Sequence, residues 1–289
     1  MSQTGTCALC LNTKADLQSS HYLPAGVYRL CKTVDTPGNS SPLLVTKGTV
    51  VQTDYQQKAF LLCSDCEQRF NRFGERWVFA NGIQKQMPTF PPLTVDEKTF
   101  PFLAKLQMLK PSQSGFGVKV FTNGQVDPIA RGALAYFAAS MFWRGAVYPW
   151  TPMRTYPVRL GPYKEDFRRY LLGQSDFPMN AALTVTVREP GMIWKHTQNP
   201  ISSRVDRAYV HRFVMPGFVF HLRVGKDLAD WIQEICFVRG AGGPVIVGSY
   251  LEQGIGDLAS GVLNEGDGAA KLQALTQRNA RGGGAPPAV

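Results

Sequence analysis

The sequence has no apolar run that is long enough and free enough of charge to cross a membrane. Its most apolar window, residues 132–150, contains Arg144 and follows Arg131, whereas a membrane-spanning helix needs about 20 residues with few charges. The window therefore predicts a buried helix. The first ten residues, MSQTGTCALC, also lack the basic and apolar regions of a secretory signal. We therefore expect a cytoplasmic chain without a membrane partner, in which disulfides are rare.

Acidic residues are scarce relative to basic ones. The chain has 31 Lys and Arg against 21 Asp and Glu, for a net charge of +10 and a pI near 9.4. Residues 1–100 hold 10 basic and 8 acidic side chains, leaving 21 and 13 for residues 101–289. This excess favours a nucleic-acid partner, because Lys and Arg displace counterions from phosphates. A scattered basic excess that keeps the surface solvated fits the same numbers.

Cysteines are few, but four of the six stand in two Cys-x-x-Cys pairs. The two-residue spacing lets both thiolates of a pair reach one tetrahedral Zn²⁺. Two matched pairs therefore predict one structural zinc site, with a redox dithiol as the alternative. The remaining cysteines, Cys31 and Cys236, are expected to be small buried side chains. The predicted zinc ligands are Cys7, Cys10, Cys63 and Cys66.

Hydrophobic periodicity and turn residues predict an α+β fold. Residues 41–53 and 56–63 are typical of strands, and residues 64–79 are typical of a helix. Asp127 and Pro128 form a helix-start signal for a helix that runs to about residue 146. A further helix is expected at 164–172, a hairpin turn at 215–217, and strands at 181–189, 207–214, 218–225 and 244–250. Residues 228–238 fit either a helix or a buried strand.

These elements suggest a small N-terminal module on a larger basic domain with an antiparallel sheet. Proline clusters and a glycine- and alanine-rich end mark the boundaries. The predicted parts are a zinc-binding treble-clef module at 1–86, a proline-rich linker at 87–95, an α+β domain at 96–254 and a flexible tail at 255–289.

The N-terminal motifs resemble those of a known enzyme family. A CALC knuckle, the segment SHYLP at 20–24, and LCSDC opening a helix are similar to the zinc-stabilised HNH nucleases with the ββα-metal fold. The resemblance covers about residues 5–80. It implies an endonuclease that hydrolyses phosphodiester bonds of DNA, and by analogy a restriction or phage-defence effector.

The resemblance also implies roles for individual residues. His21 stands where the family has its general base, and Glu67 stands where the family has a ligand of a catalytic Mg²⁺ or Mn²⁺. Asn71 and Glu75 follow Glu67 at four-residue spacing, so the three form one polar stripe on the helix, and Asn71 and Glu75 are candidate helpers at the metal. A solvated helix face is the alternative interpretation of this stripe. A neutral imidazole can take a proton from water, and a divalent cation stabilises charge on the phosphate.

The sequence departs from the family at two positions. Ser20 stands where an acidic metal ligand is common, and Lys58 is the nearest equivalent of an asparagine that orients the base. The competing hypothesis is therefore a non-catalytic zinc-finger protein that binds nucleic acid or serves as a subunit of a larger assembly. The expected partner is nucleic acid, with DNA favoured over RNA, and the subunit alternative adds protein partners in a complex. The candidate phosphate-binding residues are Arg69, Arg72, Arg168 and Arg169. The remaining histidines, His196, His211 and His221, are interpreted as structural or surface residues.

Overall fold

The computed structural model describes most of the chain from residue 3 to residue 248. The described residues are 3–13, 15–32, 43–46, 49–53, 55–82, 113–115, 118–149, 158–187, 196–205, 207–239 and 245–248. The predicted linker at 87–95 and the predicted tail at 255–289 lie outside them. The domain boundaries stay a prediction.

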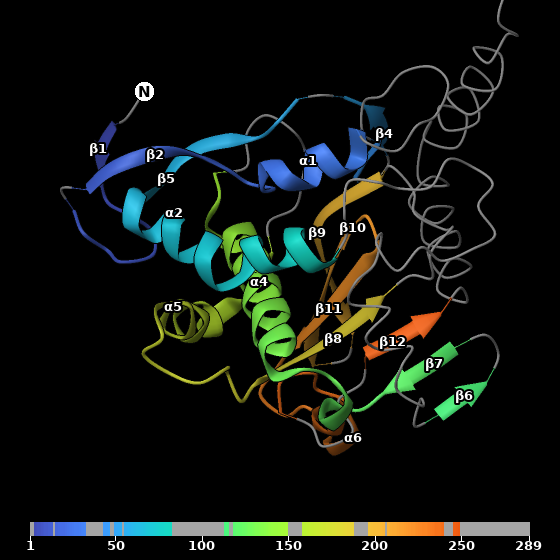
Figure 1. Ribbon diagram of the computed structural model, residues 1–289. Coiled ribbons are helices and arrows are strands. Elements are labelled where there is room, and N and C mark those ends of the chain that lie inside the picture. Colours follow the sequence, from blue (N-terminus) through green and yellow to red (C-terminus); the bar gives the residue numbers. More distant parts are fainter. Residues whose placement is uncertain are drawn as a thin grey trace, which may run out of the picture.

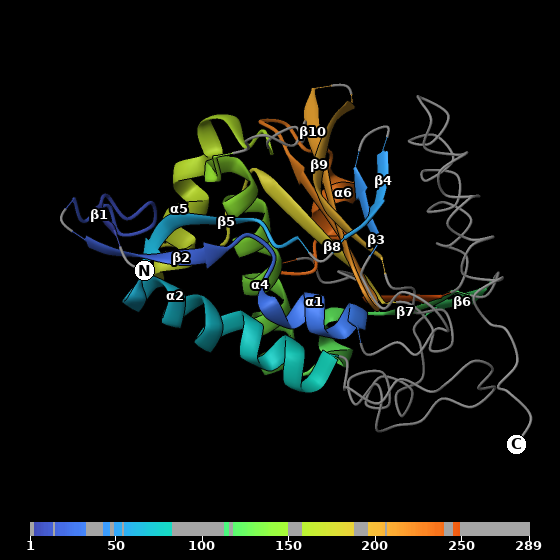
Figure 2. The ribbon, with the colours of Figure 1, turned by 90° about the horizontal axis from the view of Figure 1, so that it is seen from above.

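The described strands form a small sheet and a large one (Figures 1 and 2). The small sheet has the order β1 (Gln3–Gly5), β2 (Ala15–His21), β5 (Lys58–Cys63), and its neighbouring strands are antiparallel. The large sheet has the order β4 (Thr49–Gln52), β3 (Leu43–Thr46), β9 (His196–Val205), β10 (Ala208–Met215), β11 (Phe218–Val224), β8 (Ala181–Val187), β12 (Val245–Gly248), β7 (Val118–Phe121), β6 (Gln113–Gly115). Mixed helices and strands with mostly antiparallel pairing confirm the coarse fold class. The treble-clef assignment stays a prediction.

Helix α4 (Pro128–Val147) occupies the centre of the molecule. The Asp127 carboxylate accepts hydrogen bonds from the backbone N–H groups of Ile129 and Ala130, which confirms the predicted helix start. Both views show α4 between the helical run that follows β5 and the strands of the large sheet. Its Phe137 ring lies 5.9 Å from the ring of Phe220, measured between centroids. Neighbouring elements bury most of the α4 side chains, which confirms the buried helix predicted for residues 132–150. A helix covered on several sides is apolar around most of its circumference.

The helical run after the second cysteine pair is longer and less regular than expected. It begins as α2 (Ser64–Phe70) and continues through two π-helical turns, η1 (Asn71–Glu75) and η2 (Val78–Gly82). Gly74 lets η1 cross α4 closely, because a Cβ atom there would lie 3.0 Å from the backbone nitrogen and Cα of Phe137. The Phe70 side chain is buried against α4, whereas the Phe73 side chain is 44% exposed.

The remaining elements agree with the sequence in part. Helix α5 (Lys164–Leu172) has the predicted bounds, and Gly217 in the β10–β11 turn has a φ of +81°. Residues 228–238 contain the short helix α6 (Asp230–Glu234). The sequence did not predict strands β1, β2, β6, β7 and β9, helix α1 (Ala25–Lys32), or the 3₁₀ turns η3 (Asn123–Gln125) and η4 (Gly161–Tyr163). Among the described residues, none of the helices is long and apolar enough to span a bilayer.

Candidate metal centre and adjacent polar site

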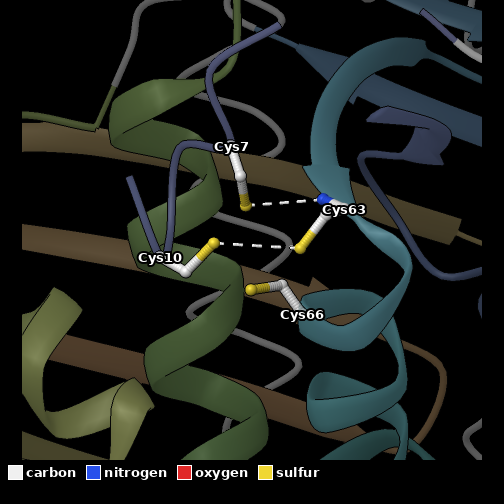
Figure 3. A group of neighbouring side chains, drawn as sticks. All are labelled: Cys7, Cys10, Cys63 and Cys66. Atoms are coloured by element: carbon white, nitrogen blue, oxygen red, sulfur yellow. Dashed lines mark hydrogen bonds between the residues drawn. The ribbon is translucent and has the colours of Figure 1, made fainter. Parts of the chain in front are cut away.

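The four predicted ligand cysteines lie together. Cys7 and Cys10 come from the turn between β1 and β2, Cys63 ends β5, and Cys66 lies in the first turn of α2. Their Sγ atoms lie within 4.8 Å of one another and point toward a common centre (Figure 3). The four cysteines are therefore positioned to bind one metal ion.

The sulfur spacing fits a tetrahedral metal rather than disulfides. The Sγ atoms of Cys10 and Cys63 are 3.8 Å apart, and all four thiols are free. A disulfide needs about 2.05 Å between its sulfurs. A tetrahedron with Zn–S bonds of about 2.3 Å has edges of about 3.8 Å.

Hydrogen bonds from backbone and side-chain donors close the first knuckle and hold it against β5 and α5. The Cys7 N–H donates to the Asn12 carbonyl at 2.9 Å, and the Ala8 N–H donates to the Leu61 carbonyl at 3.0 Å. The Cys63 N–H donates to Cys7 Sγ at 3.4 Å. From α5, Arg168 Nη1 donates to the Leu9 carbonyl at 2.7 Å. The β2–β5 pairing thus brings the two knuckles together across the intervening 52 residues, at 11–62.

The thiols influence one another electrostatically. Donation from the Cys66 thiol lowers the pKa of Cys7 to about 4, against the opposing effect of burial, and nearby backbone N–H groups add to the lowering. The same contact raises the pKa of Cys66, and burial raises the pKa of Cys63. Crowded thiolates repel one another, and a bound divalent cation would relieve that repulsion.

His21 is the last residue of β2, and it lies a few residues along the β2–β5 ladder from the cysteine cluster. Burial lowers the pKa of its imidazole, and the positive charge of Lys58, its partner across the β2–β5 ladder, lowers it further. A hydrogen bond with the Gln56 side chain and the charge of Glu67 act in the opposite direction. The net lowering keeps the ring neutral near pH 7, as a general base requires.

Glu67 lies on α2, directly after the last cysteine of the cluster. Arg144 lies 3.9 Å from Glu67 Oε2 and also donates to the carbonyl of Tyr22, the residue after His21, so the same guanidinium contacts both segments. The Glu67 Oε1 atom is buried and has no hydrogen-bond partner among the described residues. An anionic oxygen without a partner is costly. A carboxylate oxygen of this kind suits a hard divalent cation. Mg²⁺ or Mn²⁺ at Glu67 stays a prediction.

Glu75 contacts Arg144, a residue that the sequence analysis treated as an interruption of the apolar window. Arg144 Nη2 donates to Glu75 Oε1 at 2.7 Å and lies 3.9 Å from Glu67 Oε2. Burial raises the pKa of the Glu75 carboxyl, and the Arg144 charge opposes that rise. Glu75 therefore serves first as the counter-ion of Arg144.

The π-helical turn explains why Glu67 and Glu75 share a partner. In an α-helix, residues eight apart differ by about 80° around the axis beyond two full turns. A π turn takes up one extra residue, which reduces that difference to about 20° in the opposite direction. Asn71, in the middle of the predicted stripe, is exposed.

The four arginines predicted to contact nucleic acid divide into two pairs. Arg69 Nε donates to the Leu171 carbonyl at 2.6 Å, and Arg168 bonds both Glu165 and the Leu9 carbonyl. These two guanidinium groups make contacts within the fold. Arg72 and Arg169 are exposed. A nucleic-acid role for any of them stays a prediction.

Sequence reasoning missed Gln56 and Arg144. The expected position for a residue that orients the base was Lys58, but the amide that bonds His21 lies two residues earlier. Lys58 is the partner of His21 in the β2–β5 pairing, and Gln56 lies just before β5. A charged residue inside an otherwise apolar helix was the available signal for Arg144.

The histidines outside the site are accounted for where their side chains are described. His211 is fully buried, and its Nδ1 lies 2.8 Å from the Ser202 hydroxyl. Burial lowers the pKa of His211 and that of His221 to about 4. The His196 side chain and the Cys31 side chain lie outside the described residues, whereas Cys236 is buried as predicted.

Comparisons with known proteins give no relative. No protein-family model, no curated protein and no solved structure matches the chain. The similarity to HNH nucleases therefore consists of the motif residues alone. What is shown is a mixed α and β chain with four cysteines placed to hold a metal ion.

Proposed function

We propose that this chain is a metal-dependent HNH-type endonuclease that hydrolyses phosphodiester bonds of DNA. The observation that carries the proposal is that Arg144 contacts both Glu67 and the backbone next to His21, beside the four-thiol cluster. A strand that ends at the base, a second strand, and a helix that starts at the second cysteine pair form the β2–β5–α2 succession. Helix α1 and strands β3 and β4 are inserted between β2 and β5 in the chain, but β2 pairs with β5 and α2 begins where β5 ends. This spatial arrangement of two paired strands and a helix supports the ββα fold proposed from the motifs.

Zn²⁺ is the metal proposed for the cysteine cluster. Four thiolates in a tetrahedral arrangement are a closed structural site, with no position left for a substrate or water. The ion would tie the β1–β2 turn to the start of α2. It would thereby fix the segment that carries Glu67 relative to the strand that carries His21.

Mg²⁺ or Mn²⁺ is the proposed catalytic cation, and it would stabilise negative charge that develops on the phosphate. Glu67 would hold it through Oε1, which suits a cation that uses one or two carboxylates together with waters and substrate phosphate. His21 would take a proton from the attacking water. Gln56 would keep the imidazole oriented during that transfer.

A plasmid-nicking assay with purified protein tests the proposal. Protein supplied with Mg²⁺ or Mn²⁺ should convert supercoiled DNA to the open-circular form, and His21→Ala should abolish the conversion. The variant should retain one zinc per chain, which separates loss of chemistry from loss of fold. No cleavage by the wild-type protein with either metal would remove the nuclease proposal.

A non-catalytic zinc-finger protein is the second candidate, and Ser20 favours it. The Ser20 side chain is buried, and its hydroxyl donates to the Gln18 carbonyl at 3.3 Å. It therefore supplies no acidic ligand beside His21. DNA binding that persists without cleavage, and that is unchanged in His21→Ala, would support this candidate.

A further inference from the structure

The Arg144 guanidinium is buried where three parts of the candidate site meet. Arg144 is 1% exposed, although it lies on α4, far along the chain from the cysteine module. Its Nη1 donates to the Tyr22 carbonyl at 3.4 Å, and Tyr22 directly follows His21. Its Nη2 donates to Glu75 at 2.7 Å, and its plane lies over the Phe70 ring, 4.7 Å from the centroid.

The contact with Glu67 is longer than the contact with Glu75. Arg144 Nη2 is 3.9 Å from Glu67 Oε2, an attraction without a hydrogen bond, and Glu67 Oε1 has no partner among the described residues. Glu75 thus takes the strong hydrogen bond. Glu67 is held by charge, while one of its oxygens is left for another ligand.

We propose that Arg144 positions the Glu67 carboxylate and the backbone after His21 for cleavage, and that Glu75 neutralises most of the Arg144 charge so that Glu67 stays available to the cation. The proposal rests on the function proposed above. A buried guanidinium that lost Glu75 would be left as an uncompensated charge. Glu67, whose Oε2 already lies 3.9 Å from Arg144 Nη2, would then move into a full ion pair and cease to serve a cation.

Mn²⁺ binding measured by electron paramagnetic resonance tests this arrangement. Mn²⁺ is a hard cation that favours carboxylate over thiolate, so it reports on Glu67 and leaves the cysteine cluster aside. Glu75→Gln keeps the size of the side chain and removes its charge. We expect the Kd for Mn²⁺ to rise roughly tenfold in Glu75→Gln, since coupling within one charged network commonly reaches that size.

The double variant Arg144→Gln/Glu75→Gln distinguishes positioning from a structural role. Without the guanidinium, nothing draws Glu67 away from the cation, so the Kd should return to within roughly threefold of the wild-type value. DNA cleavage by this double variant should stay low, because Glu67 and the backbone after His21 are no longer held. A structural role alone would make the double variant at least as defective in Mn²⁺ binding as Glu75→Gln.

Arg239→Lys is the matched control. Arg239 also lies over an aromatic ring, that of Phe177, and also donates to backbone carbonyls, including that of Pro178 at 2.6 Å. The substitution should lower thermal stability and leave the Kd for Mn²⁺ unchanged. A similar rise in Kd in Arg239→Lys would attribute the effect to general destabilisation and would overturn the proposal.

The outcomes separate this proposal from the nuclease proposal. Cleavage by the wild-type protein, together with an unchanged Kd in Glu75→Gln, would overturn the role of Arg144 alone. The expected pattern of Kd values in a protein that never cleaves DNA would support the role of Arg144 and remove the nuclease activity. Absence of Mn²⁺ binding by the wild-type protein would overturn both.

Discussion

At the scale of single residues, His211 shows how burial fixes a charge state. Its ring is fully buried, packs against Phe142 and contacts the Ser202 hydroxyl. Burial holds its pKa at about 4, against 6.5 for an ordinary histidine. Because the unfolded chain binds the proton more readily, the unfolded state gains stability as the pH falls from about 6.5 toward 4.

We therefore expect the free energy of unfolding to decrease with acidification over that window. His211 would contribute up to about 3 kcal/mol of the decrease by pH 4. The variant His211→Asn cannot titrate, so its stability should depend less steeply on pH. Denaturant unfolding of both proteins at pH 7.5 and pH 5 measures the difference. An equal pH dependence of the free energy of unfolding in the wild-type protein and in His211→Asn would contradict a lowered pKa of His211.

Residue patterns predicted the cysteine cluster but not the whole polar site. Each Cys-x-x-Cys pair is a local pattern that can be recognised in the sequence. Because one tetrahedral zinc takes four thiolates, two such pairs predict that all four cysteines lie together. Gln56 lies just before β5 and bonds His21 at the end of β2, and Arg144 reaches the Tyr22 carbonyl from α4. Such features depend on packing between distant segments, and no local pattern records them.

At the scale of elements, the crossing of η1 over α4 positions the acidic residues. Gly74 lies against the Phe137 backbone, so the two helical segments approach without a side chain between them. The crossing places Glu75 beside Arg144. Capping residues and apolar periodicity predicted α4 and α5, whereas the π turns were not predicted because they serve a tertiary contact.

Gly74→Ala should therefore destabilise the protein. Its Cβ atom would lie 3.0 Å from the α4 backbone, which must shift to admit it, at a cost of about 1–3 kcal/mol. Gly132→Ala is the matched control, because that position on α4 has open space around it and alanine is favoured in helices by up to about 1 kcal/mol. Opposite shifts in thermal midpoint are expected, and a shift of the same sign in both variants would contradict the close crossing.

At the scale of the whole molecule, the cysteine cluster joins segments that the chain separates widely. Arg168 on α5 bonds the first knuckle, and the core runs without a break from the cysteines to α4 and the large sheet. Long-range pairings such as β3 with β9 could not be predicted from the sequence. Their partners lie about 150 residues apart, well beyond the reach of local periodicity.

Removal of the metal should therefore destabilise the whole folded protein and not only the turn that carries Cys7 and Cys10. A chelator, or the variant Cys10→Ser, should release close to one zinc per chain and lower the thermal midpoint by roughly 10 °C or more. Cys236→Ala alters a buried cysteine outside the cluster and should keep its zinc. Atomic absorption with thermal unfolding checks both expectations, and full zinc retention in Cys10→Ser would contradict the four-thiolate site.

The stretch between His21 and the second knuckle lends its hairpin, β3 and β4, to the edge of the large sheet, where β3 lies parallel to β9. A fragment that ends after the predicted N-terminal module would contain the β3–β4 hairpin without β9, its neighbour in the large sheet. The orphaned ribbon would present a row of unsatisfied amides and carbonyls, a template for aggregation. A recombinant fragment of residues 1–86 should consequently aggregate when it is expressed alone. Co-expression with residues 87–289 should reduce that aggregation.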